Sequence, residues 1–120
     1  SANINGTVQM LPIESFKESI IAANGKSARS SDWKTVYVGT GARTISMTGD
    51  GNYIFSAINN LSKVVVIDRK TFKVINEIKA DSYPVGMDIS PDNKLLVVTA
   101  QGRNREGGNS VMIYKITKDN

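Results

Sequence analysis

Cysteine and histidine are both absent from the 120 residues of this chain. Without cysteine, disulfides and thiolate metal sites are excluded. Without histidine, the chain lacks the usual general base, the commonest transition-metal ligand and any Ser-His-Asp mechanism. We therefore expect no metal, no cofactor and no catalytic residues within this chain itself.

Long apolar runs and a one-signed charge pattern are also missing. No stretch approaches the ~18 apolar residues of a membrane span, and no signal peptide opens the chain. The net charge is +4, but the basic residues are scattered among acidic ones, as is common in small domains. We expect neither a membrane span nor specific nucleic-acid binding.

What the sequence does contain is a repeat. Sliding it by about 42 positions places Val36 on Ile78, Ile45 on Met87 and Asp50 on Asp92. A period of this length, made of short β segments, is typical of a propeller blade with four strands. The fold class predicted is all-β: a β-propeller segment of four-stranded antiparallel blades, roughly two blades plus a partial one.

The strands of these blades can be placed from alternation and turn residues. In blade order they are a third and a fourth strand, a full set of four, and then a first, a second and a third. We assign residues 1–32 to a partial blade and a flexible loop, and 33–120 to two blades (about 33–80 and 81–120) of one larger propeller domain. The expected strands are 6–11, 33–38, 44–48, 53–58, 63–68, 72–79, 85–90, 95–100 and 110–116.

One helix is expected between the first two strands. Ile13, Phe16, Ile20 and Ile21 are spaced along one helical face, and Asn24-Gly25 supplies a stop. The spacing favours a short helix near residues 13–23. The repeat offers an alternative, because Phe16-Lys17 matches Phe72-Lys73 and would make this segment the turn into a fourth strand.

Two blades cannot close a ring, since a propeller needs at least about four. The chain is therefore expected to be a segment of a longer protein or one member of an assembly, which includes a homo-oligomeric ring. The missing strands would come from another polypeptide by main-chain pairing along exposed edges. The expected partners are the segments or subunits that complete the propeller.

Acidic and aromatic residues that stand out have structural interpretations. Asp50 and Asp92 could be calcium ligands, but each repeat offers one carboxylate without the required spacing, so we assign them to hairpin turns. Asp68 is predicted to cap the turn after its strand. Trp33 falls on Ile75 in the repeat, which predicts core packing.

Candidate binding residues come from the loops at one end of the blades, where propellers usually bind ligands. These loops are 39–43, 59–62, 81–85 and 101–109, the last of which carries a five-residue insertion because Val64 matches Val111. The alternative is that these loops are merely solvated. The side chains there that could hold an anion or a partner are Arg43, Asn60, Tyr83, Arg103 and Arg105.

Three stretches carry a resemblance to a known family: VGTGARTISMTGDGNYIFSA (38–57), KVVVIDRKTFKVINEI (63–78) and YPVGMDISPDNKLLVVTA (83–100). They resemble the YVTN family of β-propeller repeats, with its Ser-Pro-Asp-Gly turn, Leu-Tyr-Val-Thr-Asn strand and Val-x-Val-Ile-Asp strand. This sequence departs from the family pattern with Asn93 in place of the turn glycine and with degraded versions of the middle strand.

The resemblance implies architecture more than function, because one fold hosts unrelated chemistries. Proteins with this repeat include surface-layer and cell-envelope proteins, and related propellers serve as amine dehydrogenase subunits and lactonases. We expect a non-catalytic scaffold or interaction segment in an extracytoplasmic setting. The alternative is a segment of a propeller enzyme or oxidoreductase subunit, amine dehydrogenase-like or lactonase-like, whose catalytic residues lie outside this chain.

Overall fold

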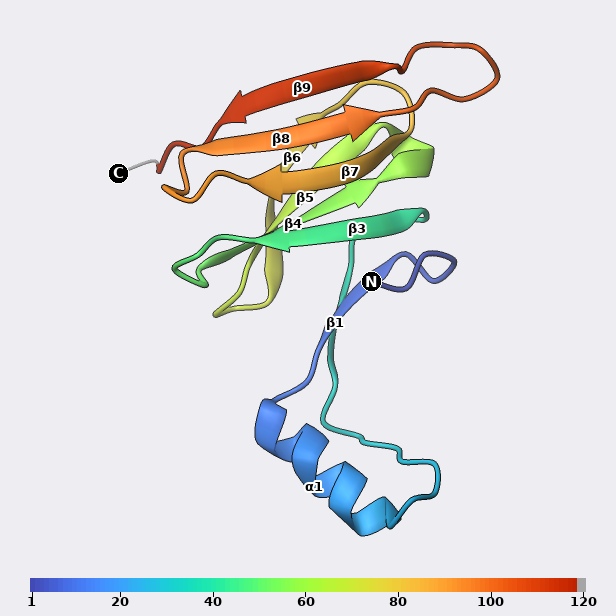
Figure 1. Ribbon diagram of the computed structural model, residues 1–120, viewed down its shortest axis with the longest axis vertical. Helices are drawn as coiled ribbons and strands as arrows, with labels where there is room; N and C mark the ends of the chain where they lie inside the picture. The colour runs from blue at the N-terminus through green and yellow to red at the C-terminus, as the bar shows by residue number, and fades with distance from the viewer. Residues whose placement is uncertain (119–120) are drawn as a thin grey trace.

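The computed structural model describes residues 1–118, which form nine strands and one α-helix (Figure 1). A short 3-10 turn (Asn59–Leu61) adds to them. Every expected strand is present within two residues of its predicted bounds. In chain order the elements are β1 (Thr7–Met10), α1 (Ile13–Ala23), β2 (Lys34–Tyr37), β3 (Ala42–Met47), β4 (Tyr53–Ile58), β5 (Lys63–Asp68), β6 (Lys73–Lys79), β7 (Pro84–Ile89), β8 (Leu95–Ala100) and β9 (Ser110–Lys115).

The strands form three antiparallel sheets, in the orders β1-β2, β3-β4-β5-β6 and β7-β8-β9. Each sheet is a simple meander in which chain neighbours pair. The predicted order, a third and fourth strand, a full set of four, and then a first, second and third, is therefore confirmed within residues 1–118. The chain is an all-β, propeller-like segment.

The two central strands of the middle sheet, β4 and β5, are buried on both faces. Successive residues of β5 point to opposite sides, and Val64, Val65, Val66 and Ile67 are all buried. This explains the continuous apolar run in the sequence, which is expected for a strand covered on both faces. One face packs on β1 and β2, and the other packs on β7, β8 and β9.

Two separate cores result from this stacking. The first contains Val8, Val38, Ala42, Ile54, Ile58, Val65, Ile67 and Phe72. The second contains Phe55, Val64, Val66, Ala80, Leu96 and Val98. The cores lie on either side of the middle sheet, as expected for blades stacked face to face around an axis.

The sheets are also joined by polar contacts between the second and third blades. Thr44 Oγ1 donates to the carbonyl oxygen of Val85 (2.5 Å), and Gly49 N donates to Asn93 Oδ1 (2.7 Å). Innermost strands β3 and β7 thus lie side by side, as Figure 1 shows.

Helix α1 occupies the predicted residues and extends away from the sheets (Figure 1). It follows Pro12 and ends at Asn24, whose left-handed backbone (φ 45°) lets its N–H bond to the Ile21 carbonyl. The alternative of a turn into a fourth strand at Phe16-Lys17 is wrong. These residues lie within α1, and the fourth strand of this blade is β2, which begins at Lys34. Within the described chain, no residue of α1 is buried.

The position of Trp33 contradicts the prediction that it packs in the core. Its side chain is 47 % exposed and lines a pocket together with Phe16 and Ile20 of α1, just before β2 begins. Ile75, its partner in the repeat, is similarly exposed at 54 %. Trp33 directly precedes β2 and Ile75 lies within β6. Both strands are outer edges of their sheets, so the repeat match holds but core packing does not.

No helix among residues 1–118 has the length and hydrophobicity needed to cross a membrane.

Candidate functional site

The loops predicted to form a binding surface do lie at one end of the blades. Ala42 at the start of β3 pairs with Ile58 at the end of β4, and Pro84 at the start of β7 pairs with Ala100 at the end of β8. The loops before β3 and β7 and those after β4 and β8 therefore share one end of the stacked sheets.

Three of the five predicted residues meet there. Arg103 Nη1 donates to Asn60 Oδ1 (3.2 Å), and Arg103 Cζ lies 5.6 Å from the centroid of the Tyr83 ring. A guanidinium at this distance from an aromatic face is attracted by the ring quadrupole. Residues from two adjacent blades are thus brought together; we refer to Asn60, Tyr83 and Arg103 as the arginine cluster.

The other two predicted residues lie apart from this cluster. Arg105 is at the exposed tip of the 101–109 loop, next to an isolated bridge between Arg103 and Glu106. Arg43 has an exposed side chain, and its carbonyl accepts a hydrogen bond from Ser1 Oγ (2.9 Å). Within residues 1–118, neither side chain hydrogen-bonds to the arginine cluster.

Tyr83 has an unusual backbone. Its φ of 59° lies in the left-handed region, which bulky residues rarely adopt and which often occurs at ligand sites. Hydrogen bonds across the loop hold this turn: Gln101 N donates to the Tyr83 carbonyl (3.2 Å) and Gly102 N to the Ser82 carbonyl (2.9 Å). They connect the loops that carry Tyr83 and Arg103.

Asp81 fixes the inserted loop and was not singled out from the sequence. Its carboxylate accepts hydrogen bonds from Ser110 Oγ (2.6 Å), Ser82 N (2.6 Å) and Gly108 N (3.0 Å). These bonds, that from Ser110 foremost, hold the pKa of Asp81 below its usual value, because they favour the ionised form. Asp81 therefore ties the C-terminal end of the loop to the turn that precedes β7.

A signal for this contact was present in the sequence. At the offset of 42, Asp81 falls on Gly39, so the second copy gains a carboxylate where the first has none. The same copy gains the five extra residues of the 101–109 loop. Two departures from one repeat that occur together indicate an interaction between them.

Chemically, the arginine cluster can bind and orient a ligand. It offers one guanidinium with further free N–H donors, a phenol and an amide. The carboxylate of Asp81, which anchors the same loop, accepts three hydrogen bonds that lower its pKa, and this makes it a weak base. The arrangement suits recognition of an anionic or carboxylate-bearing group at the end of the blades.

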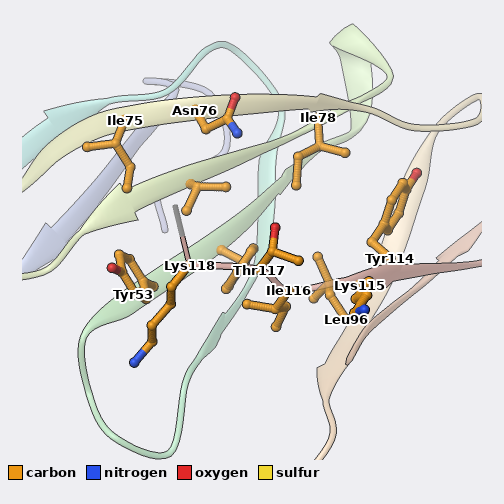
Figure 2. A pocket seen from close by; sticks show the side chains of 12 residues that line it. Tyr53, Ile75, Asn76, Ile78, Leu96, Tyr114, Lys115, Ile116, Thr117 and Lys118 are labelled. Carbon is orange, nitrogen blue, oxygen red and sulfur yellow. The ribbon is translucent and has the colours of Figure 1, made fainter. Parts of the chain in front are cut away.

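A second candidate site is a pocket of about 340 Å³ with a mixed polar and apolar lining, between the outer part of the middle sheet and β9 (Figure 2). Ile75, Asn76 and Ile78 of β6 line one side, and Tyr114 and Ile116 line the other. Tyr114 Oη donates to the Lys79 carbonyl (2.9 Å) and closes one end. Burial, with Asp81 nearby, raises the pKa of Tyr114.

The fold and these sites define a β-propeller-like segment with a loop surface at one end. No protein-family model matches the chain, and no curated protein matches it. The resemblance to the YVTN family therefore stays a prediction.

Among solved structures, the chain is similar to hydrazine synthase from Kuenenia stuttgartiensis, a β-propeller-containing protein. The identity is 27 % and the TM-score is 0.53, over 64 % of this chain and 21 % of that chain. The chain thus spans about a fifth of the length of the protein it matches. The similarity supports the propeller-like fold.

Proposed function

We propose that this chain is a non-catalytic scaffold or interaction segment of a β-propeller, which it completes together with other chain segments or subunits. One observation carries the proposal: a complete four-stranded blade lies between two incomplete ones. Each gap leaves apolar surface of the complete blade uncovered.

Exposed apolar side chains of the complete blade border the gap on the first side. Ile45 and Met47 of β3 point to the same face as Ile54 of β4, which is the face that β1 and β2 cover elsewhere. Because β1 and β2 take the place of third and fourth strands, nothing in residues 1–118 lies where first and second strands would cover β3. Ile45 and Met47 are consequently 45 % and 54 % exposed.

The outer face of the last sheet is apolar too. Val97 pairs with Ile113, and Thr99 pairs with Val111. Val111 and Ile113 are both about two-thirds exposed, at 65 % and 66 %. Contiguous exposed apolar surface of this kind marks interaction sites, and its position is that of the contact with a next blade.

The native mass of the chain tests the proposal. We expect a mass above 13.0 kDa, made of several copies or of this chain with a second polypeptide. Ile45→Lys should reduce assembly because it places a charge in the gap, whereas Ile21→Lys on the exposed outer side of α1 is the matched control. A stable 13.0 kDa monomer that is indifferent to Ile45→Lys would contradict the proposal.

The proposal extends to family and location. The repeat resembles YVTN repeats, whose members include cell-envelope proteins, so we assign the chain to an extracytoplasmic compartment. Fractionation of the source cells with an antibody against this chain tests the assignment. Recovery with cytoplasmic marker proteins would contradict it.

The second candidate is a segment of a propeller enzyme or oxidoreductase subunit with catalytic residues on other chain segments. The similarity to hydrazine synthase and the position of the arginine cluster at a blade end favour it. In the assembled complex, Arg103→Ala lowering turnover at unchanged native mass would support the enzyme. Loss of a partner on Arg103→Ala would support the scaffold.

A further inference from the structure

Asparagine is followed by glycine at two places in the sequence, Asn5-Gly6 and Asn24-Gly25, and aspartate is followed by glycine at one, Asp50-Gly51. Such pairs can close to a succinimide ring, because glycine has no Cβ that would shield its N–H from the side-chain carbonyl before it. The ring closes only where the glycine N–H is unbonded and the backbone can rotate. The structure distinguishes the three pairs on both counts.

Tertiary contacts hold Asn5-Gly6 in place. Gly6 is buried, and its N–H donates to the Asn3 carbonyl (3.3 Å). The Gly6 carbonyl accepts from Val38 N (2.8 Å) and Gly39 N (3.2 Å). A Cβ on Gly6 would lie 2.6 Å from the carbonyl carbon of Gly39, so Gly6 cannot rotate without separating the two segments. This pair is protected.

The hairpin turn protects Asp50-Gly51. Gly51 N donates to the Thr48 carbonyl (2.8 Å), and Asp50 Oδ1 accepts from Thr48 Oγ1 and Asn52 N. These bonds, that from Thr48 foremost, lower the pKa of Asp50, and an ionised carboxylate is a poor electrophile. Both groups that would have to react are therefore engaged.

Asn24-Gly25 has no such protection. Both residues are exposed at the end of α1, which extends away from the sheets (Figure 1). Beyond its chain neighbours, no atom lies within 4 Å of a Cβ position on Gly25, and no main-chain acceptor in residues 1–118 bonds to its N–H. Two hydrogen bonds hold the turn, from Asn24 N to the Ile21 carbonyl (3.2 Å) and from Lys26 N to the Ala23 carbonyl (2.9 Å). Exposed helix ends of this kind open readily.

We propose that Asn24 is a site of spontaneous covalent modification, at which its carboxamide is converted to aspartate and isoaspartate through a succinimide formed with Gly25. Gly25 N attacks Asn24 Cγ, so that an N–Cγ bond forms, the Cγ–Nδ2 bond breaks and ammonia leaves with the proton of the attacking N–H. Water then opens the ring. Opening at Cγ gives aspartate, and opening at the main-chain carbonyl carbon gives isoaspartate. The inference does not depend on the proposed function.

The modification changes both the charge and the backbone at the end of α1. The net charge of +4 falls by one, and the new carboxylate lies at the negative end of the helix dipole, where the last turn contains no basic residue. Isoaspartate also inserts a methylene group into the main chain, which separates Lys26 N from the Ala23 carbonyl. We expect the last turn to open while the sheets stay folded, because no residue of α1 is buried in the described chain.

Hydroxylamine tests the site, because it cleaves the main chain at a succinimide. The full chain is incubated with it in mildly alkaline buffer, both in the native state and in guanidinium chloride. In the native state we expect the fragments 1–24 and 25–120, with cleavage at Asn5-Gly6 at least about tenfold slower because local unfolding must precede it. In guanidinium chloride both asparagine pairs should be cleaved at similar rates. Without hydroxylamine, the native chain should accumulate a more acidic form in which peptide mapping finds isoaspartate at position 24.

Asn24→Gln is the matched variant, since glutamine would have to close a larger ring and does so slowly, and Asn5→Gln is its control. Asn24→Gln should abolish native cleavage and the acidic form, whereas Asn5→Gln should change neither. In the purified isoaspartyl form, the Lys26 amide should exchange faster at an unchanged midpoint of urea unfolding; unchanged exchange would overturn the expected opening of the turn. Equal native cleavage at both asparagine pairs, or cleavage of Asn24-Gly25 in guanidinium chloride alone, would overturn the proposal.

Discussion

Asp50 and Asp92 make the same set of hydrogen bonds in two hairpin turns separated by one repeat. Asp50 Oδ1 accepts from Thr48 Oγ1 (2.6 Å) and Asn52 N (3.0 Å). Asp92 Oδ1 accepts from Ser90 Oγ (2.6 Å) and Lys94 N (3.1 Å). The carboxylates are thus structural, because their oxygens satisfy the turn, as predicted for aspartate in this position.

These bonds predict a loss of stability in acid. Hydrogen bonds to hydroxyl and amide groups lower the pKa values of Asp50, Asp68, Asp81 and Asp92 below the ordinary value of 3.8. A lowered folded-state pKa contributes stability above about pH 3.8 that is lost as the pH falls through the folded value. Urea unfolding between pH 7 and pH 2 should show a decline that begins near pH 4.

A variant tests the origin of that decline. Asp68 Oδ1 accepts from Thr71 N (2.6 Å) and Thr71 Oγ1 (2.7 Å). Asp68→Asn should flatten the decline. Asp88→Asn, at an exposed position of β7, removes a carboxylate elsewhere in the chain and is the control for the change in charge alone. An unchanged slope in Asp68→Asn would contradict the assignment.

Leu96 should contribute far more to folding than its neighbour. Leu96 is fully buried between the second and third sheets, whereas Leu95 points outward and is 41 % exposed. Leu96→Ala should lower the free energy of unfolding by about 2–5 kcal/mol, and Leu95→Ala by about 0.5 kcal/mol or less. Equal effects in urea titrations would mean that a partner covers Leu95 or that the core is packed differently.

Gly41 is expected to be irreplaceable for a steric reason. Its φ is 91°, and a Cβ there would overlap Asn59 Oδ1 and Asn60 N. Gly25 also has a positive φ (80°) but no atom near its Cβ position. Gly25→Ala should cost about 1–2 kcal/mol of backbone strain, and Gly41→Ala distinctly more; thermal unfolding of both variants measures the difference.

Proteolysis tests whether Asp81 holds the inserted loop. Trypsin should cut the wild-type chain first near Lys26–Arg29 and near Arg103–Arg105, where the basic side chains are exposed. Asp81→Asn should speed cleavage at the second site by releasing Gly108 and Ser110. The rate at Lys26–Arg29 is the internal control, and uniform resistance of both loops would indicate that a partner covers them.

Much of the fold could be predicted because the repeat supplies each strand twice. Val64 to Ile67 are apolar in succession, which requires a strand covered on both faces, and β5 has that position. For the arginine cluster, the sequence predicted only which loops share one end of the blades and not which of their side chains meet. Arg103 and Asn60 are 43 residues apart, and only the stacking of two blades decides that they meet while Arg43 and Arg105 stay apart.

Trp33 shows where the repeat misleads. Periodicity assigns it to the place of Ile75, but neither residue is in the core, because a fourth strand is the sheet edge. Asp81 shows the reverse case, in which a departure from the repeat carried information about a long-range contact.

By itself the sequence determined the local structure of this protein: the strand alternation, the aspartate turns, the helix at 13–23 and the number of strands in each blade. These follow from side-chain periodicity and turn chemistry, which act over a few residues. Tertiary structure alone decided which faces stayed open, which loops met, and that a pocket adjoins the free edge of β9. Those features depend on how sheets stack, because burial is a property of neighbours distant in the chain.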